Sequence, residues 1–172
     1  AQADREGRIP LIIGEPRHPE VMGVASWSDR SVIFPGPEEL EKWLLQEPSR
    51  QSLSLTAVAQ TTCIRTIWET SKEILKKLCT NAKIFDTICS ATHRRQLEAA
   101  ELAAQADVMV VVGDRKSANT KHLAEICRKA CPVVYQIEQA GELTTGFLSG
   151  CTMAGLTAGA STPAGIIKEV YT

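Results

Sequence analysis

The amino-acid sequence predicts an α/β fold made of two tandem small domains, each with a mostly parallel four-stranded sheet flanked by helices. Three observations lead to this prediction. Short apolar runs alternate with helical patterns, the order of these elements repeats once along the chain, and the loops that follow matching strands have similar chemistry. The length of 172 residues allows one domain or two small ones.

In the first half, strands are expected at short runs rich in Val, Ile, Leu and Ala. Helices are expected where apolar residues recur three and four positions apart. The expected strands lie at residues 9–13, 31–34, 53–59 and 82–85. The expected helices lie at residues 19–25, 37–45 and 63–78.

The second half repeats this plan, including a glycine directly after its first strand and small polar residues before its last helix. The expected strands lie at residues 108–112, 133–137 and 153–157. The expected helices lie at residues 93–105, 119–129, 144–148 and 163–171. We interpret the repetition as two α/β domains, residues 1–85 and 86–172. The alternative is one continuous sheet.

The charge balance excludes several functional classes. The chain has 19 Lys and Arg against 20 Asp and Glu, a net charge of -1, so it lacks the basic surplus that nucleic-acid coating or binding to acidic membranes requires. Its longest apolar run, at residues 108–112, is far shorter than the ~18 residues of a membrane span. We expect a protein of the cytoplasm, or of the plastid stroma in a eukaryote, that binds neither nucleic acid nor membrane.

The chain has six cysteines and begins without Met or an apolar signal-peptide core. No two of the cysteines form a Cys-x-x-Cys pair, so free thiols are expected rather than a local zinc site or a disulfide framework. The start of the sequence is expected to be a cut within a longer chain. The cysteines are Cys63, Cys79, Cys89, Cys127, Cys131 and Cys151.

Polar residues gather where the predicted strands end, at residues 14–20, 60–62, 113–120 and 157–163. In open parallel sheets, ligands bind at the carboxyl ends of the strands, beside helix N-termini whose free amides attract anions. These segments carry mainly hydroxyl, amide, imidazole and carboxyl groups. They favour a phosphorylated ligand held by neutral donors over one held by a basic patch.

The first candidate site residues lie in two predicted turns. His18 and Glu20 place an imidazole and a carboxylate two residues apart, so His18 can bind a phosphate oxygen while Glu20 relays a proton. An exposed turn, with Glu20 favourable to the helix dipole, explains the pair equally well. Ser117 and Asn119 can bind an anion or simply cap the next helix. Near the C-terminus, Ser161 lies in a run of small residues that leaves room for a ligand. Ser161 or Thr162 can also cap the last helix, with Pro163 at its first position.

Cys89 lies after a predicted strand and before a helix, where the thiol pKa is lowered and the sulfur suits a nucleophile or a metal ligand. Alternatively, Cys89 is a small buried apolar residue, and we assign the remaining five cysteines to that class. A further alternative is a cysteine hydrolase in which Cys89 and His93 meet at helical spacing.

Taken together, five segments resemble the LytB family, the 4-hydroxy-3-methylbut-2-enyl diphosphate reductases that end the non-mevalonate isoprenoid pathway. They occur in the family's order and spacing across the whole chain. The segments are His18-Pro19-Glu20-Val21-x-Gly23, Gln60-Thr61-Thr62, Asp86-x-Ile88-Cys89-x-Ala91-Thr92-x-x-Arg95-Gln96, Val111-Val112-Gly113-x-x-x-Ser117-x-Asn119 and Thr157-Ala158-Gly159-Ala160-Ser161-x-Pro163.

The resemblance implies an iron–sulfur oxidoreductase that reductively removes the allylic hydroxyl of an isoprenoid diphosphate and releases isopentenyl and dimethylallyl diphosphate. It implies Cys89 as one of three ligands of a 4Fe-4S cluster, Glu20 as the proton source, and Thr61 as the hydroxyl that helps to orient the leaving group. It also implies a ferredoxin- or flavodoxin-type electron donor. The diphosphate binders that it implies are His18, Ser117, Asn119 and Ser161.

The resemblance further implies an N-terminal domain with two more cluster cysteines, and that domain has no counterpart in these 172 residues. One matching cysteine cannot hold a four-iron cluster. We therefore expect this chain to be the second and third domains of a three-domain enzyme, inactive alone and without a stable cluster of its own. The alternative is a catalytically silent α/β module that retains diphosphate binding.

Overall fold

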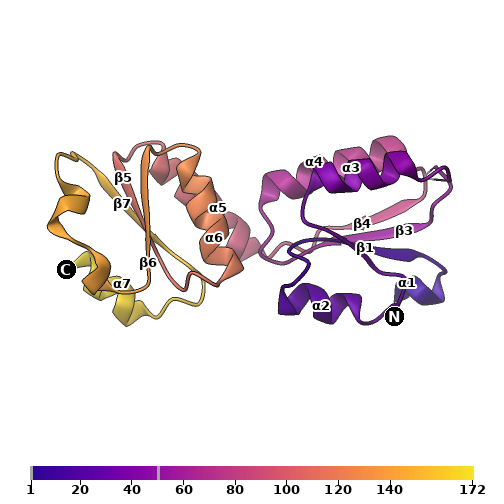
Figure 1. The fold of residues 1–172 in the computed structure, drawn as a ribbon, viewed down its shortest axis with the longest axis horizontal. Coiled ribbons are helices and arrows are strands. Elements are labelled where there is room, and N and C mark those ends of the chain that lie inside the picture. Colours follow the sequence, from indigo (N-terminus) through magenta and orange to yellow (C-terminus); the bar gives the residue numbers. More distant parts are fainter. Residues whose placement is uncertain (1, 50) are drawn as a thin grey trace. The chain divides into compact units, whose positions relative to one another are not determined.

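Parallel strands alternate with helices in the computed structural model, which describes residues 2–49 and 51–172 (Figure 1). The chain divides into two compact units, Ala1–Cys89 and Ser90–Thr172. Each unit has its own sheet, and all strand pairs are parallel. The alternative of one continuous sheet is therefore wrong.

The first unit has a four-stranded sheet in the order β2-β1-β3-β4. Helices α3 and α4 cover one face of this sheet, and α1 and α2 lie on the other (Figure 1). Its elements are α1 (Gln2–Arg5), β1 (Ile9–Ile13), α2 (Pro19–Ala25), β2 (Val32–Phe34), α3 (Pro37–Gln46), β3 (Leu55–Ala59), α4 (Arg65–Leu78) and β4 (Ala82–Phe85).

The core of the first unit lies between the sheet and the α3–α4 layer. Alternate residues of β1 and β3, such as Leu11 and Ala57, point into this layer and are fully buried. Trp68 and Leu75 of α4 pack against them. This core holds β1 and β3 side by side in register from Ile9↔Leu55 to Ile13↔Ala59.

The second unit has a three-stranded sheet in the order β6-β5-β7. Every residue of the central strand β5 is buried, because apolar clusters cover both of its faces. One cluster includes residues of α5 and α6, and the other includes Ile166 and Val170 of α7. The elements are α5 (Ser90–Ala103), β5 (Val108–Val112), α6 (Ala118–Arg128), β6 (Val133–Ile137), the 3-10 helices η1 (Ala140–Glu142) and η2 (Thr145–Leu148), β7 (Ala154–Ala158) and α7 (Ala164–Tyr171).

The two units repeat each other with an offset of 99 residues. Adding 99 to the numbers of β1 and β3 gives the numbers of β5 and β7, and the pairing Ile9↔Leu55 becomes Val108↔Ala154. The same offset takes the first residue of α4, Arg65, to Ala164, the first residue of α7. The repetition expected from the order of elements is therefore a residue-by-residue repetition in this part of the fold.

Most predicted elements are present, and the differences concern segments where local pattern is weak. The second sheet has three strands among the described residues, where four were expected. The helix expected at 93–105 spans Ser90–Ala103, so it begins directly after Cys89 and ends two residues earlier than predicted. The helix expected at 144–148 is a short 3-10 segment. The short helices α1 and η1 were not predicted, because three or four residues give no period to detect.

The helices of both units are modest in length, and the longest, α4 and α5, have 14 residues each. None of the described helices has both the length and the apolar character that crossing a bilayer demands.

Adjacent leucines of α3 test the position of the core. Leu44 is fully buried and Leu45 is 56% exposed. Replacing Leu44 with Ala should lower the free energy of unfolding by about 2–5 kcal/mol, because the change leaves a cavity in the core. Leu45→Ala should change it by less than about 1 kcal/mol. Urea unfolding of both variants measures the difference, and equal effects would contradict this placement of α3.

Candidate functional site

The segment between β1 and α2 positions the first two predicted site residues. His18 is the N-cap of α2, and its Nδ1 accepts a hydrogen bond from the backbone N–H of Glu20 at 3.2 Å. Pro19 occupies the first helical position, where its missing N–H costs nothing. The imidazole is thus oriented by the helix it caps, and the Glu20 side chain remains available for another partner.

That partner is Thr61, which follows β3. The carboxylate of Glu20 accepts from the backbone N–H of Thr61 at 2.7 Å and from its hydroxyl at 3.0 Å. The two residues are 41 positions apart in sequence and meet because β1 and β3 are parallel neighbours whose carboxyl ends lie at one edge of the sheet. The Thr61 oxygen has lone pairs left for a ligand.

A close approach between Gly14 and Gln60 holds these two loops together. A Cβ on Gly14 would lie 2.7 Å from the Cβ of Gln60 and 2.9 Å from Val21, closer than side chains approach. The Gln60 side chain is buried, and its Oε1 accepts from the N–H of Glu15 at 2.9 Å. Its Nε2 is buried without a partner among the described residues. Gln60 was quoted in a family segment but not selected as a site residue.

Cys89 lies at the same edge of the first unit. Its backbone N–H donates to the carbonyl of Thr61 at 3.0 Å, and its side chain is exposed. Two residues earlier, the Thr87 hydroxyl bonds both backbone groups of Ala59, at the end of β3. Helix α5 begins at Ser90, so Cys89 lies directly before its first residue.

The other cysteines have different surroundings. Four of the six are buried, and Cys151 is partly exposed. Burial raises the pKa of the Cys63 thiol to about 12 and that of the Cys127 thiol to about 11. Thiols with such pKa values are inert near neutral pH. No group of three His, Cys, Asp or Glu suited to a metal ion occurs among the described residues.

In the second unit, the predicted residues Ser117 and Asn119 lie at the start of α6. Ser117 is the N-cap, and its Oγ accepts from the N–H of Thr120 at 3.4 Å, so the capping role is present. Asn119 is only 5% exposed, and neither its Oδ1 nor its Nδ2 has a partner among the described residues. A buried amide without partners costs free energy that a bound ligand can recover.

The last predicted residue, Ser161, is exposed in a tight loop between β7 and α7. The loop is tight because Gly159 lies against Thr120, where a Cβ would be 2.4 Å from the Thr120 Oγ1. Gly113, with a φ of +143°, approaches both Thr120 and Thr162. The expected cap by Ser161 or Thr162 is absent: Pro163 is the N-cap, and the Thr162 hydroxyl donates to the carbonyl of Val112 at 3.0 Å.

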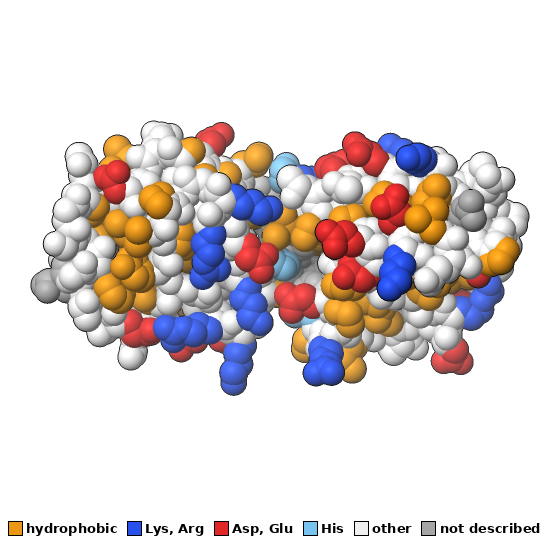
Figure 2. All heavy atoms as spheres, turned by 45° about the horizontal axis from the view of Figure 1, so that its top comes forward, with side chains coloured by type: hydrophobic (Ala, Val, Ile, Leu, Met, Phe, Trp, Pro, Cys, Tyr) orange, Lys and Arg blue, Asp and Glu red, His pale blue; other side chains and the backbone are white. Residues whose placement is uncertain are grey.

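The structure therefore brings the predicted residues together in two groups, one at the strand ends of each unit. His18, Glu20, Thr61 and Cys89 belong to the first, and Ser117, Asn119 and Ser161 to the second. The 99-residue offset takes His18 to Ser117 and Glu20 to Asn119, so these two pairs of candidates occupy equivalent positions in the two units. Acidic and basic side chains both occur on the face of each unit drawn in Figure 2.

The chain is similar to proteins of one family over its whole length. A family model described as "LytB protein" matches residues 1–172. The reductase named 4-hydroxy-3-methylbut-2-enyl diphosphate reductase from Caldanaerobacter subterraneus subsp. tengcongensis is 41% identical over 167 residues, which are 96% of this chain and 56% of the relative. Reductases of the same name from Anaeromyxobacter and Nitratiruptor are 38% and 37% identical, with 58% and 60% of their lengths covered.

Two solved structures are also similar. The E-1-hydroxy-2-methyl-but-2-enyl-4-diphosphate reductase from Plasmodium falciparum matches with a TM-score of 0.89 at 23% identity, over 99% of this chain and 53% of that one. A second, described as (E)-4-hydroxy-3-methyl-but-2-enyl diphosphate reductase, the terminal enzyme of the non-mevalonate pathway, has a TM-score of 0.51 at 32% identity, over 99% and 60%. The chain spans a little more than half the length of these relatives.

Two glycines near α2 test the close approach of the loops. Gly14→Ala should lower the free energy of unfolding by about 1–3 kcal/mol, because the new methyl group collides with Gln60 and Val21. Gly23→Ala, inside α2 with nothing within 4 Å of the new Cβ, should raise it by about 0.5–1 kcal/mol. Thermal or urea unfolding distinguishes the two, and a neutral Gly14→Ala change would contradict the packing.

Proposed function

We propose that this chain, which belongs to the LytB protein family, forms the second and third domains of a 4-hydroxy-3-methylbut-2-enyl diphosphate reductase, with a further domain supplied from outside these residues. The reaction replaces the allylic hydroxyl with hydrogen, using two electrons and two protons, and releases water with isopentenyl or dimethylallyl diphosphate. Named reductases at 37–41% identity across nearly the whole chain support this assignment. The contact between Glu20 and Thr61 is the structural observation that carries it.

The Glu20–Thr61 pair suits protonation of a leaving hydroxyl. The distance of 3.0 Å between the Glu20 Oε2 and the Thr61 Oγ1 allows a hydrogen bond in either direction. When Glu20 is protonated, it donates to the Thr61 oxygen, whose own hydrogen can point to the substrate hydroxyl. The proton then passes through Thr61 to the departing oxygen, which leaves as water, and Glu20 becomes a carboxylate held by the Thr61 N–H.

Diphosphate recognition is assigned to His18, Ser117, Asn119 and Ser161. These side chains offer hydroxyl, amide and imidazole groups, which agrees with a chain whose net charge is only -1. The unpartnered buried amide of Asn119 supports a ligand contact there most strongly. The N-terminus of α6 adds backbone N–H groups and the positive end of the helix dipole.

The cluster itself does not fit this chain alone. A 4Fe-4S cluster held by three thiolates would bind the substrate oxygen as a Lewis acid and deliver electrons. In the described part of the chain, Cys89 is the cysteine that lies beside Thr61, and the buried cysteines lie in the hydrophobic cores. We assign Cys89 as one ligand and place the other two outside these residues, together with a ferredoxin- or flavodoxin-type electron donor.

A second candidate is a diphosphate-binding module without catalysis. The unpartnered Asn119 amide favours it, since binding needs only the neutral donors and no cluster. Reductase activity, measured after the missing domain is supplied, distinguishes the reductase from the binding module.

Titration of the 172-residue chain with isopentenyl diphosphate tests the binding residues. Asn119→Ala should weaken binding by about 1–3 kcal/mol, roughly 5- to 150-fold in Kd, because a buried amide that bonds the ligand is removed. Lys121→Ala, an exposed charge on the same helix, should change Kd by less than about 3-fold. Equal losses in both variants would indicate a general electrostatic effect, and no binding by the native chain would contradict the binding role.

Co-production of this chain with the unmatched part of the Caldanaerobacter relative, reconstituted with iron and sulfide, tests the reductase. We expect turnover with a strong chemical reductant. Glu20→Gln should lower kcat by about 10²–10⁴-fold with a smaller change in KM, because the proton donor is lost after binding. Glu38→Gln, an exposed carboxylate in the first turn of α3, serves as control and should retain activity. Diphosphate binding without turnover would favour the binding module.

A further inference from the structure

The chain that follows β4 turns toward the loop after β3 and reaches the Glu20–Thr61 pair. The N–H of Cys89 donates to the carbonyl of Thr61 at 3.0 Å. The N–H and the hydroxyl of Thr61 donate in turn to the Glu20 carboxylate, at 2.7 and 3.0 Å. The position of Cys89 relative to this pair therefore depends on what holds residues 86–88.

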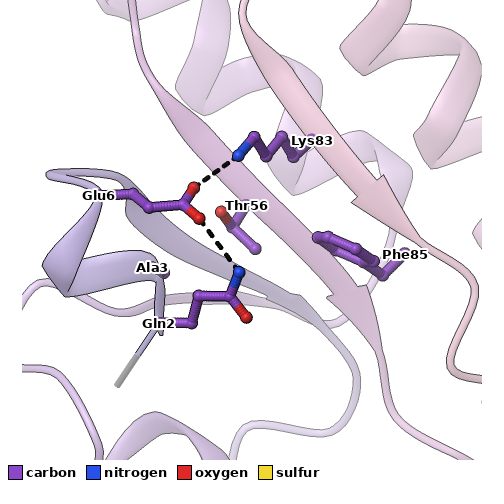
Figure 3. A pocket seen from close by; sticks show the side chains of 6 residues that line it. All are labelled: Gln2, Ala3, Glu6, Thr56, Lys83 and Phe85. Atoms are coloured by element: carbon purple, nitrogen blue, oxygen red, sulfur yellow. Dashed lines mark hydrogen bonds and ion pairs between the residues drawn. The ribbon is translucent and has the colours of Figure 1, made fainter.

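Strand β4 has anchors of its own, and they lie before this segment. Figure 3 shows Lys83 of β4 beside Thr56 of β3, with α1 across from them. The ammonium group of Lys83 lies 2.6 Å from the Glu6 carboxylate. Directly before the strand, the hydroxyl of Thr80 donates to the carbonyl of Gln51 at 2.6 Å. These contacts fix the strand, and the path of the chain beyond it needs other contacts.

The hydroxyl of Thr87 continues the pairing of β3 at the point where β4 ends. The pairing of the two strands runs to Val58↔Phe85, and Ala59 is the next and last residue of β3. The Thr87 Oγ1 accepts from the Ala59 N–H at 2.9 Å and donates to the Ala59 carbonyl at 2.5 Å. A hydroxyl can do both because it accepts and donates at one oxygen. The side chain of Thr87 thus takes the place of a strand backbone beside Ala59.

The neighbours of Thr87 hold the same segment in less specific ways. Ile88 is 8% exposed and packs into the core of the first unit, and burial of this kind has no preferred direction. Asp86 forms an ion pair with Arg65, the first residue of α4, but the Asp86 side chain is 46% exposed and such pairs contribute little. The two hydrogen bonds of Thr87 have defined directions, so they set the path of the chain.

We propose that Thr87 is a positioning residue, whose hydroxyl sets the path from β4 to Cys89 and so holds Cys89 beside Thr61. The inference rests on the proposed function, in which Cys89 is a cluster ligand and Thr61 passes the proton. Thr87 acts through the backbone of Ala59 and carries no step of the reaction itself. Its role is to keep the ligand and the proton-transfer pair at a fixed separation.

Amide hydrogen exchange, measured by NMR on the isotope-labelled 172-residue chain, tests this positioning without a cluster. In the native chain the Ala59 amide should be protected, although pairing with β4 ends before it. Thr87→Val keeps the shape of the side chain and removes both hydrogen bonds, so the Cys89 amide should exchange at least ~10-fold faster. Thr87→Ser keeps the hydroxyl, and exchange at Cys89 should stay within ~3-fold of the native rate.

Thr80→Val is the matched control, because it removes an exposed hydroxyl that bonds a backbone carbonyl at the other end of β4. It should change exchange at Cys89 by less than ~3-fold. Amides of the interior strand β1 report opening of the whole unit, and a general loss of stability would speed them as much as Cys89. An unprotected Ala59 amide, native exchange at Cys89 in Thr87→Val, or an equal change at β1 would overturn the proposal. The native Ala59 amide decides the matter if Thr87→Val fails to fold.

The complex with the unmatched part of the Caldanaerobacter relative connects the positioning to the reaction. Thr87→Val should lower kcat at least ~10-fold and leave KM within ~3-fold, because the diphosphate-binding residues are unchanged. Thr87→Ser and Thr80→Val should keep kcat within ~3-fold of the native value. Native kcat in Thr87→Val would overturn the positioning role. Absence of turnover in the native complex would instead contradict the proposed function, and the exchange rates would still decide whether Thr87 positions Cys89.

Discussion

The candidate site depends on how closely the loops after neighbouring parallel strands approach each other. Gly14 lies against Gln60 and Val21, and Gly113 lies against Thr120 and Thr162, at distances that leave no room for a side chain on either glycine. Because these loops touch, residues tens of positions apart reach one edge of the sheet. The Glu20–Thr61 contact joins two such loops.

The repeated scaffold carries different chemistry in its two copies. In the first unit the helix cap is an imidazole and the next-but-one residue is a carboxylate that meets a hydroxyl. In the second unit the equivalent positions hold a serine and a buried asparagine. One copy is suited to proton transfer and the other to holding an anion with neutral donors, so a shared backbone supports two parts of the proposed reaction.

Burial also explains why the cysteine count is a poor guide to chemistry. Four thiols lie in the interior, and burial raises the pKa values of two of them well above neutrality. Cys89 differs because it follows an outer strand and lies next to Thr61 at the strand-end edge. Its role in the proposed cluster comes from that location and from the family segment around it.

The sequence by itself determined the α/β class, the repetition, the family segments and the bounds of several strands, including 9–13 and 108–112, because apolar period and glycine turns are local signals. Only the tertiary structure decided which polar residues meet. The Glu20–Thr61 bond, the burial of Asn119 and the hydrogen bond from the Glu15 N–H to the buried Gln60 side chain depend on which strands are neighbours, and no local pattern specifies that. The strand orders β2-β1-β3-β4 and β6-β5-β7 were also invisible in the sequence, since a strand order is set by packing between distant segments rather than by the residues of any one strand.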